Sequence, residues 1–421
     1  MSGRRRAVND GDTVVVATGQ VSPEGIPAGD GPKRRGRPRK RHTVAKVLGT
    51  TTLILALVVA MSVVYLYRHL SSNLAVVDID SQLSDRPSEL AVEGPKKPVN
   101  ILVMGSDSRE GKNNIDGLTG LGERSDTTIL IHLSADRTRA YGISIPRDSM
   151  VNRPECRLKD GDTVPAADYQ MWNTAFSVGG AACTVQQFEQ LTGVRVQHFV
   201  VVDFQGFKDM VDAINGVEVC LPEPIDDPEH NIHLKAGTRE IKGNEALAYV
   251  RVRYRVGNGS DTSRVKRQQA FLASMARKVI SADTLSRPDR TYMFLNAATS
   301  SLTVDKGLKN MGKIAEVAIQ FKDIGLDKIQ FVTVPWGADP LDPNRIVWKP
   351  EATELWQRIA NDRPLTKQLK DGVIKASDPN LEATGSGNGN GSSPSAPNSP
   401  GKSSSPSAEE IQQAQADGLC A

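Results

Sequence analysis

Two aspartates stand at the ends of apolar runs that are typical of strands. Asp107 follows the run 99–104 after Gly105 and Ser106, and Asp126 lies just before the run 128–133. Carboxylates at neighbouring strand ends can share a hard divalent cation, whose other ligands are waters and a substrate phosphate. Asp107 and Asp126 are therefore candidate ligands for magnesium, or for manganese in its place. Alternatively, both residues are turn formers.

A third strand-like run, 140–145, ends at Pro146 and is followed by Arg147 and Asp148. The planar guanidinium of an arginine at a strand end can donate two parallel hydrogen bonds to a phosphate or a carboxylate. An ion pair between Arg147 and either Asp148 or Asp126 is an equally good interpretation of the sequence alone.

The segment YVRVRYR, residues 249–255, concentrates positive charge. If it is extended, its period of two places Arg251, Arg253 and Arg255 on one face. We therefore predict a strand with one cationic face.

A predicted helix follows this segment after a glycine-containing turn. Asp261 and Ser263 are suitable helix caps, and Arg264, Arg267 and Gln268 fall within one turn of that helix. Arginines that converge from a strand and a helix repel one another unless an anion lies between them. The pattern favours the binding of an anion such as pyrophosphate over a solvated charged face.

The elements that must position these residues begin with an apolar run of 21 uncharged residues, 47–67. This length is enough to cross about 30 Å of hydrocarbon as a helix, so we predict one transmembrane helix over 44–67. Residues 1–46 carry eleven Lys/Arg against four Asp/Glu. The positive-inside rule then predicts a single-pass protein of the cell membrane with a cytoplasmic N-terminus and an extracytoplasmic C-terminal part.

Composition divides the rest of the chain. We predict a disordered basic tail over 1–43, an extracytoplasmic linker over 68–94, a catalytic domain over 95–370, and a disordered tail rich in Ser, Gly and Pro over 371–421. Within the domain, the predicted strands are 99–104, 128–133, 140–145, 198–202 and 329–334. The predicted helices are 184–191, 204–214, 263–280 and 308–321. This alternation predicts an α/β fold with a sheet flanked by helices.

The four cysteines lie in the part of the chain that is expected to be exported, where disulfides persist. We expect Cys156, Cys183 and Cys220 to be partly paired, with the pairing left open, and Cys420 in the C-terminal tail to be free. None of the four has the spacing of a metal site.

The segment KRRGRPRKR, residues 33–41, contains an Arg-Gly-Arg-Pro core that in AT-hook peptides lies in the minor groove of DNA. A basic flank that binds anionic lipid headgroups explains the same residues. With a single copy so near a membrane span, we do not expect a nucleic-acid partner.

Taken together, seven blocks closely resemble the LytR-CpsA-Psr family of bacterial membrane-anchored glycopolymer phosphotransferases. They are NILVMGSDSR, RSDTTILIHL, ISIPRD, MWNTAFSVGGAACTVQQFEQLTGV, HFVVVDFQGFKDMVDAINGVEV, LKAGTREIKGNEALAYVRVR and DTSRVKRQQAFL. The resemblance runs from about residue 99 to residue 280. The blocks around Cys183 and Cys220 resemble its actinobacterial branch. The resemblance implies the family's fold, a central mixed sheet flanked by helices whose apolar interior holds a polyprenyl chain.

The resemblance also implies roles for individual residues. Asp107 and Asp126 match the family's magnesium-binding aspartates. The positions that match its pyrophosphate-binding and catalytic set are Arg147, Arg251, Arg253, Arg264 and Gln268, and Asp261 matches an acidic residue that orients those arginines. Asp107, Asp126 and Asp148 remain candidates for the general base.

The activity implied is magnesium-dependent transfer of a glycopolymer, similar to teichoic acid, arabinogalactan or capsule, from a polyprenyl pyrophosphate carrier to peptidoglycan during cell-wall assembly. Two alternatives stay open. The same site could hydrolyse the lipid pyrophosphate with water as acceptor, or the Arg-Gly-Arg-Pro tail could make the protein a DNA-binding transcriptional attenuator.

Overall fold

The computed structural model describes residues 43–92, 96–106, 125–228, 232–252, 261–281, 287–379 and 408–420. The chain divides into two units, Met1–Val59 and Ala60–Ala421, and of the first unit the structure describes residues 43–59. Helix α1 (Thr43–Asn73) contains the predicted membrane span and continues six residues beyond its expected end at residue 67. By length and composition, α1 is a candidate membrane-spanning helix. The elements discussed below belong to the second unit, which includes residues 60–73 of α1.

The second unit is built on an eight-stranded mixed sheet, in agreement with the predicted fold. Its strand order is β1-β14-β9-β2-β3-β4-β15-β18. In that order the strands are Ala75–Val76, Leu302–Val304, His198–Asp203, Val99–Ser106, Ser125–Leu133, Ala140–Ile145, Ile329–Thr333 and Ile374–Lys375. β2 pairs in parallel with β9 and antiparallel with β3, and β4 pairs in parallel with β15. The carboxyl ends of β2, β9, β4 and β15 therefore meet at one edge, together with the start of β3.

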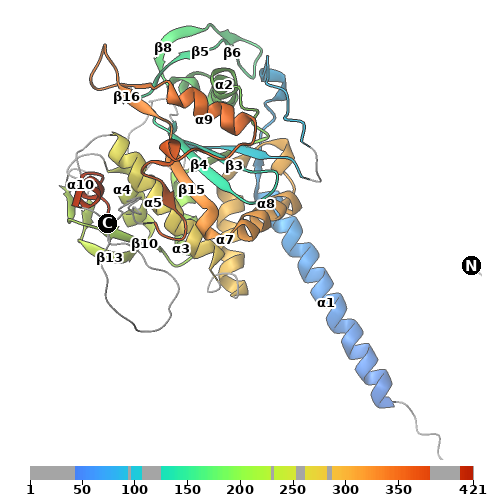
Figure 1. The fold of residues 1–421 in the computed structure, drawn as a ribbon. Helices are drawn as coiled ribbons and strands as arrows, with labels where there is room; N and C mark the ends of the chain where they lie inside the picture. Colours follow the sequence, from blue (N-terminus) through green and yellow to red (C-terminus); the bar gives the residue numbers. More distant parts are fainter. Residues whose placement is uncertain are drawn as a thin grey trace, which may run out of the picture. The chain divides into compact units, whose positions relative to one another are not determined.

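Alternation along the central strands gives the sheet two different faces. Leu102 pairs with Leu130 and both belong to the main core, whereas Val103 pairs with Ile129 and both line a cavity on the other face. The first face packs against α2 (Thr174–Thr192) and α9 (Glu351–Ala360). Figure 1 shows these two helices on one side of the sheet and helices α3, α5 and α7 on the other.

Four further helices complete the second face and its flank: α3 (Phe204–Ala213), α5 (Asp261–Ile280), α7 (Pro288–Ser301) and α8 (Met311–Ile324). The helices predicted over 204–214, 263–280 and 308–321 thus exist, and each boundary lies within three residues of its expected place. The predicted helix over 184–191 is the second half of α2, which is kinked at Gly179 and Gly180.

One part of the sequence prediction is wrong. Residues 249–251 are not extended, because they form the last turn of α4 (Gly243–Arg251). The Val/Arg alternation concealed the preceding Glu245, Ala246 and Leu247, which favour a helix, and α4 buries Ala246, Leu247 and Tyr249 on one face. Arg253 and Arg255 lie outside the described residues.

Five small antiparallel strand pairs lie outside the main sheet in the described part of the chain. They are β5 (Met150–Arg153) with β8 (Ala167–Met171), β6 (Cys156–Arg157) with β7 (Thr163–Val164), β10 (Val217–Leu221) with β13 (Gly237–Ile241), β11 (Ile225–Asp227) with β12 (Ile232–Leu234), and β16 (Trp336–Ala338) with β17 (Ile346–Trp348).

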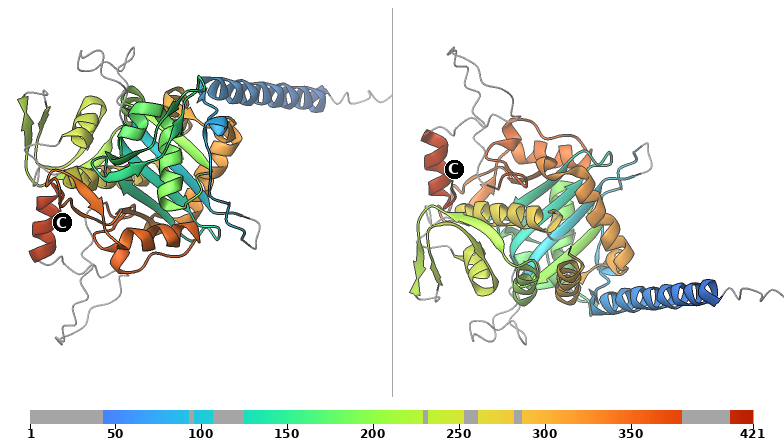
Figure 2. Two further views of the ribbon diagram at one scale, coloured as in Figure 1. Left: turned by 90° about the horizontal axis from the view of Figure 1, so that it is seen from above. Right: turned by 90° about the horizontal axis from the view of Figure 1, so that it is seen from below.

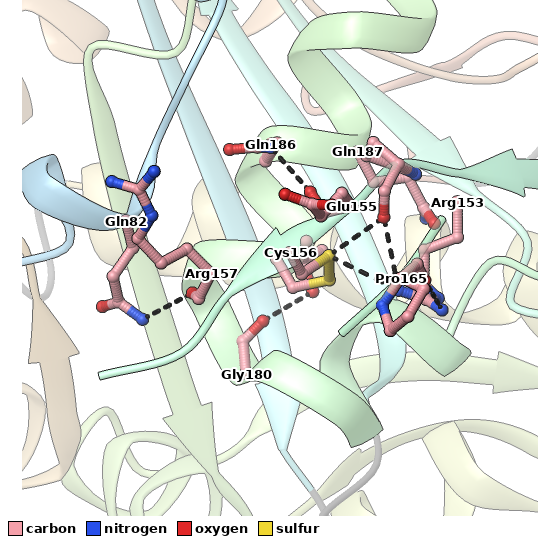
Figure 3. Close-up of a disulfide and its surroundings, with 12 residues drawn as sticks. Gln82, Arg153, Glu155, Cys156, Arg157, Pro165, Gly180, Gln186 and Gln187 are labelled. Atoms are coloured by element: carbon pink, nitrogen blue, oxygen red, sulfur yellow. Dashed lines mark hydrogen bonds between the residues drawn. A yellow bond between two sulfur atoms is a disulfide. The ribbon is translucent and has the colours of Figure 1, made fainter. Parts of the chain in front are cut away.

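A disulfide between Cys156 and Cys183 joins β6 to α2. Around it, Gln186 donates to the Glu155 carbonyl and Arg153 donates to the Pro165 carbonyl (Figure 3).

The C-terminal tail corrects two predictions. Cys420 is not free, because it forms a disulfide with Cys220. The prediction that residues 371–421 are disordered is wrong at both ends of that segment. β18 adds to the sheet, and residues 408–416 form helix α10 (Ala408–Ala416). Residues 380–407 lie outside the described residues. Ala414 and Leu419 are buried in one cluster with residues of α5, and Figure 2 shows the red C-terminal helix at one end of the yellow α5. The sequence did not reveal this docking, because the segment is of low complexity and few of its residues, such as Ala414 and Leu419, are buried apolar ones.

The predicted linker over 68–94 is also largely part of the domain. β1 adds to the sheet beside β14, and Ile79 is buried in the main core. Further along, the Arg86 guanidinium donates to both carboxylate oxygens of Glu189 on α2, over 2.8 and 2.7 Å. Glu189 is 1% exposed and also accepts from the Val196 amide at 2.8 Å. This ion pair fixes the chain between α1 and the sheet.

We predict that Glu189→Gln lowers the free energy of unfolding by about 3 kcal/mol, because it leaves the Arg86 charge without its buried partner. The matched control is Glu89→Gln, since Glu89 and its partner Lys97 are 49% and 68% exposed, and we expect it to change that free energy by less than about 1 kcal/mol. Urea unfolding of both variants measures the difference. Equal effects would contradict a structural role for the Arg86–Glu189 pair.

Candidate active site

A cavity of about 420 Å³ lies between the second face of the sheet and helices α3, α4 and α5. Most of its lining is apolar. These side chains are Val103, Ile129, Val202, Phe204, Phe207, Met210, Leu247, Val250, Phe271, Leu272 and Met275. The cavity therefore offers a hydrocarbon-like environment along most of its wall, which suits an apolar chain better than a sugar.

Charged side chains line the same cavity where strands β3 and β4 reach the edge of the sheet. They are Asp126, Arg147, Asp203, Arg251 and Arg264, with the amide of Gln268 beside them. Asp126 is the second residue of β3 and Arg147 follows β4, while Arg251 ends α4 and Arg264 lies in the first turn of α5. Asp203 ends β9, so five separate elements deliver charge to one place, and the described lining carries three positive and two negative side chains.

Asp126 is at the centre of this charged group. The Arg147 guanidinium donates a short hydrogen bond to its carboxylate. Burial alone would raise the pKa of Asp126, but the charges of Arg147, Arg264 and Arg251 together with that hydrogen bond hold the pKa below its ordinary value. Asp126 is therefore ionised at neutral pH, and the three guanidinium groups are close enough to act on a single carboxylate.

Two hydrogen bonds from α5 fix the end of α4, where Arg251 lies. The Gln268 amide donates to the Val250 carbonyl at 3.0 Å, and Arg267 donates to the Val252 carbonyl. On its other side, the Arg251 guanidinium lies 4.6 Å from the centre of the Phe204 ring, a distance at which a cation is attracted to an aromatic face. The orientation of Arg251 therefore depends on both α5 and α3.

An adjacent side of α5 contacts the C-terminal segment. Ser263 Oγ lies 3.4 Å from the Asp417 carboxylate, and Arg267 Nη1 lies 3.5 Å from the Asp417 carbonyl oxygen. Arg267 is fully buried and does not line the cavity. The structure therefore does not support the expected role of Arg267 in binding substrate, and gives it a position in which it links α4, α5 and the C-terminal segment.

The other predicted site residues divide into two groups. The structure brings Asp126, Arg147, Arg251, Arg264 and Gln268 together in one cavity. Asp107 and Arg253 lie outside the described residues, and of Asp261 only its place as the first residue of α5 is described.

Asp148, a candidate general base, lies between two guanidinium groups. Its Oδ1 is 3.8 Å from Arg147 Nε and 3.4 Å from Arg345 Nη1. This geometry makes Asp148 a carboxylate that orients Arg147. Sequence reasoning missed Arg345, which follows a turn that carries no catalytic pattern, and it missed the wall of α3, whose apolar residues look like ordinary core.

Magnesium fits the chemistry of this site in one respect. Mg²⁺ prefers carboxylate oxygens, needs few protein ligands and completes its shell with water and phosphate, and Asp126 provides an ionised carboxylate at the cavity. Within the described part of the chain, no three His, Cys, Asp or Glu side chains cluster to hold a metal ion. The other predicted ligand, Asp107, follows the last residue of β2 outside the described residues.

Similarity to known proteins identifies the family of this chain. The LytR_cpsA_psr family model matches residues 65–361, and the chain therefore belongs to this family, as the sequence motifs predicted. It is 33% identical over 302 residues to the probable cell wall biosynthesis protein LcpB of Corynebacterium glutamicum, covering 69% of this chain and 66% of LcpB. It is 28% identical to the polyisoprenyl-teichoic acid–peptidoglycan teichoic acid transferase TagV of Bacillus subtilis, covering 75% of this chain and 77% of TagV.

The fold has a counterpart among solved structures. Protein gbs0355 from Streptococcus agalactiae superimposes with a TM-score of 0.52 at 24% identity, covering 64% of this chain and 90% of that chain. This similarity supports the fold. A further relative, the cell wall biosynthesis protein LcpA of Corynebacterium glutamicum, is 29% identical, and the match covers 56% of this chain and 49% of LcpA.

The lowered pKa of Asp126 predicts how stability depends on pH. Because the folded protein binds this proton less tightly than the unfolded chain does, the carboxylate stabilises the fold above its ordinary pKa of 3.8, and this contribution is lost as the pH falls below that value. We expect the difference in unfolding free energy between wild type and Asp126→Asn to be constant from pH 7 to about 5 and to shrink below about pH 4. Denaturant unfolding at each pH measures it, and a difference that stays constant down to about pH 3 would contradict this assignment.

Proposed function

We propose that this protein is a membrane-anchored phosphotransferase that moves a glycopolymer from a polyprenyl pyrophosphate carrier to peptidoglycan. One observation carries the proposal: arginines from three elements meet at an apolar cavity. The arginines match the charge of a pyrophosphate, and the apolar wall beside them matches a hydrocarbon chain joined to that pyrophosphate. The names of the relatives support it, since TagV is named as a transferase of polyisoprenyl-linked teichoic acid to peptidoglycan.

In the proposed reaction, an acceptor hydroxyl of peptidoglycan attacks the phosphorus that bears the glycan. The bond between that phosphorus and the bridging oxygen breaks, a phosphodiester forms, and polyprenyl phosphate leaves with the electron pair. The hydroxyl proton passes to a base. No ATP is consumed, because the pyrophosphate bond supplies the free energy.

The work of the protein is mainly electrostatic. Arg147, Arg251 and Arg264 bind the pyrophosphate oxygens and stabilise the charge that develops on the leaving phosphate. Gln268 helps to hold the end of α4 that carries Arg251. The apolar wall binds the polyprenyl chain and so positions the pyrophosphate at the edge of the sheet.

We further propose that Asp126, with Asp107, holds a magnesium ion at the pyrophosphate. When bound, the ion would neutralise negative charge on the phosphate oxygens. Asp126 is suited to this task because neighbouring guanidinium groups keep it ionised. The basic flank of the apolar run favours the orientation in which the catalytic unit faces the cell wall.

The test uses the full chain in detergent with a polyprenyl pyrophosphate oligosaccharide and peptidoglycan fragments, with and without magnesium. We expect magnesium-dependent formation of a phosphodiester-linked product, and a loss of at least about a hundredfold in Arg147→Ala, since that change removes a donor to the transferring group. Lys278→Ala is the control, because Lys278 pairs with Glu240 away from the cavity.

Mass spectrometry of the products separates the outcomes. Glycan attached to peptidoglycan supports the transferase. Glycan phosphate free in solution would replace the transferase with a hydrolase, and full activity in Arg147→Ala would contradict the proposed site.

A further inference from the structure

Helix α7 runs beside the last turns of α1. His69 Nε2 lies 3.2 Å from Asn296 Oδ1, and the Asn73 amide lies 3.1 Å from that oxygen and 3.5 Å from Thr299 Oγ1. Higher residue numbers in α1 thus meet higher residue numbers in α7, which means that the two helices run parallel. The strands that follow them agree, because β1 and β14 pair in parallel with Ala75 opposite Thr303.

This register places the first turns of α7 at the level of the apolar run. One helical turn before His69 and Asn296 lie residues 65–66 of α1 and residues 292–293 of α7. The uncharged run ends at Tyr67 and is followed by Arg68. If α1 spans the membrane, Tyr292 and Met293 are therefore level with the last turn of the span.

The exposed side chains at this end of α7 suit a lipid surface. Tyr292 is 41% exposed and Met293 is 51% exposed. Tyrosine is enriched where membrane meets water, because its ring is apolar and its hydroxyl is polar. Arg290 and Arg287 precede them and can reach lipid phosphates.

The inner side of α7 covers the apolar part of the cavity. Ala297 is buried in one cluster with Met210, and Phe294 and Met275 pack against that cluster; Met210 and Met275 also line the cavity. The helices α3 and α7 approach closely, since a Cβ on Gly206 would lie 2.0 Å from the Ser301 Cβ. One helix thus faces both the end of the membrane span and the wall of the cavity.

We propose that residues 288–295 of α7 contact the lipid leaflet from which α1 emerges, with Tyr292 and Met293 in the interfacial region, and that the hydrocarbon chain of the substrate reaches the cavity from this leaflet along α7. The second part rests on the proposed function. The first part does not, because it depends only on the helix register and on α1 spanning the membrane. Contact with the leaflet allows the chain to pass from lipid to protein with little exposure to water, which avoids the cost of hydrating a long hydrocarbon.

The depth of α7 is measured with Met293→Cys in the full chain, reconstituted in phosphatidylglycerol/phosphatidylcholine vesicles and labelled with a nitrobenzoxadiazole dye. All four native cysteines are disulfide-bonded, so the introduced thiol is the one that reacts. The control is Leu341→Cys, since Leu341 is 79% exposed between β16 and β17. Trp348 of β17 packs against the α2/α9 core on the opposite side of the sheet from α7, and Figure 1 shows β16 and α7 on opposite sides.

We expect nitroxide lipids labelled near the headgroup to quench the dye at position 293 and a water-soluble quencher to be less effective there, with the reverse at position 341. Equal access of the water-soluble quencher to both positions would overturn the membrane contact. This outcome does not depend on activity, so it is distinct from a failure of the proposed function.

The access route is tested by Met293→Glu, with Leu341→Glu as control. Turnover of a long-chain polyprenyl pyrophosphate in vesicles is expected to fall about tenfold in Met293→Glu, while turnover of a short-chain, water-soluble substrate stays at the wild-type rate, because the loss of one buried Met-sized contact corresponds to about that factor. Equal activity of Met293→Glu on the two substrates, relative to wild type, would overturn the route along α7.

Discussion

Three guanidinium groups that act on one carboxylate, beside an apolar cavity, are the constraint on which the rest of this structure depends. Arg147, Arg251 and Arg264 come from three different elements, and each lowers the pKa of Asp126. Like charges in an apolar surrounding repel strongly, so the fold must hold these side chains firmly. It does so by attaching each arginine to a rigid element and by fixing those elements to one another.

Helix α5 is the main support. One side presents Arg264 and Gln268 to the cavity, and the adjacent side carries Ser263 and Arg267, which contact the C-terminal segment. The Cys220–Cys420 disulfide joins that segment to β10. The end of the chain therefore stabilises the helix that positions the site, although Ser263 and Arg267 are 154 and 150 residues from Asp417 in sequence. Arg147 has a comparable support in Asp148, which Arg345 holds from the other side.

Much of the fold and part of the site could be predicted from the sequence. The strands at 99–104 and 140–145 were predictable because short, mainly apolar runs that contain β-branched residues are typical of buried strands. Asp126 and Arg147 were predictable because charged residues beside such strands need a partner. The expected strand was wrong over residues 249–251, because alternation of Val and Arg over a few residues cannot be distinguished from the end of an amphipathic helix. The docking of residues 408–420 was missed, since it depends on a disulfide and on contacts between distant segments. Arg267 shows the same limit: it is one helical turn from Arg264 and looks equally suited to an anion, but its guanidinium donates to the Val252 and Asp417 carbonyls instead of lining the cavity.

The most direct test of the central claim is calorimetric titration of the protein with farnesyl pyrophosphate, farnesyl monophosphate and inorganic pyrophosphate in the presence of magnesium. If the arginines and the apolar cavity form one site, farnesyl pyrophosphate binds at least about tenfold more tightly than inorganic pyrophosphate, because burial of a few methylene groups provides that factor. Arg264→Gln then weakens both pyrophosphates more than it weakens the monophosphate. Equal affinities for farnesyl pyrophosphate and inorganic pyrophosphate, or an unchanged affinity in Arg264→Gln, would contradict the claim that this cavity binds a lipid pyrophosphate.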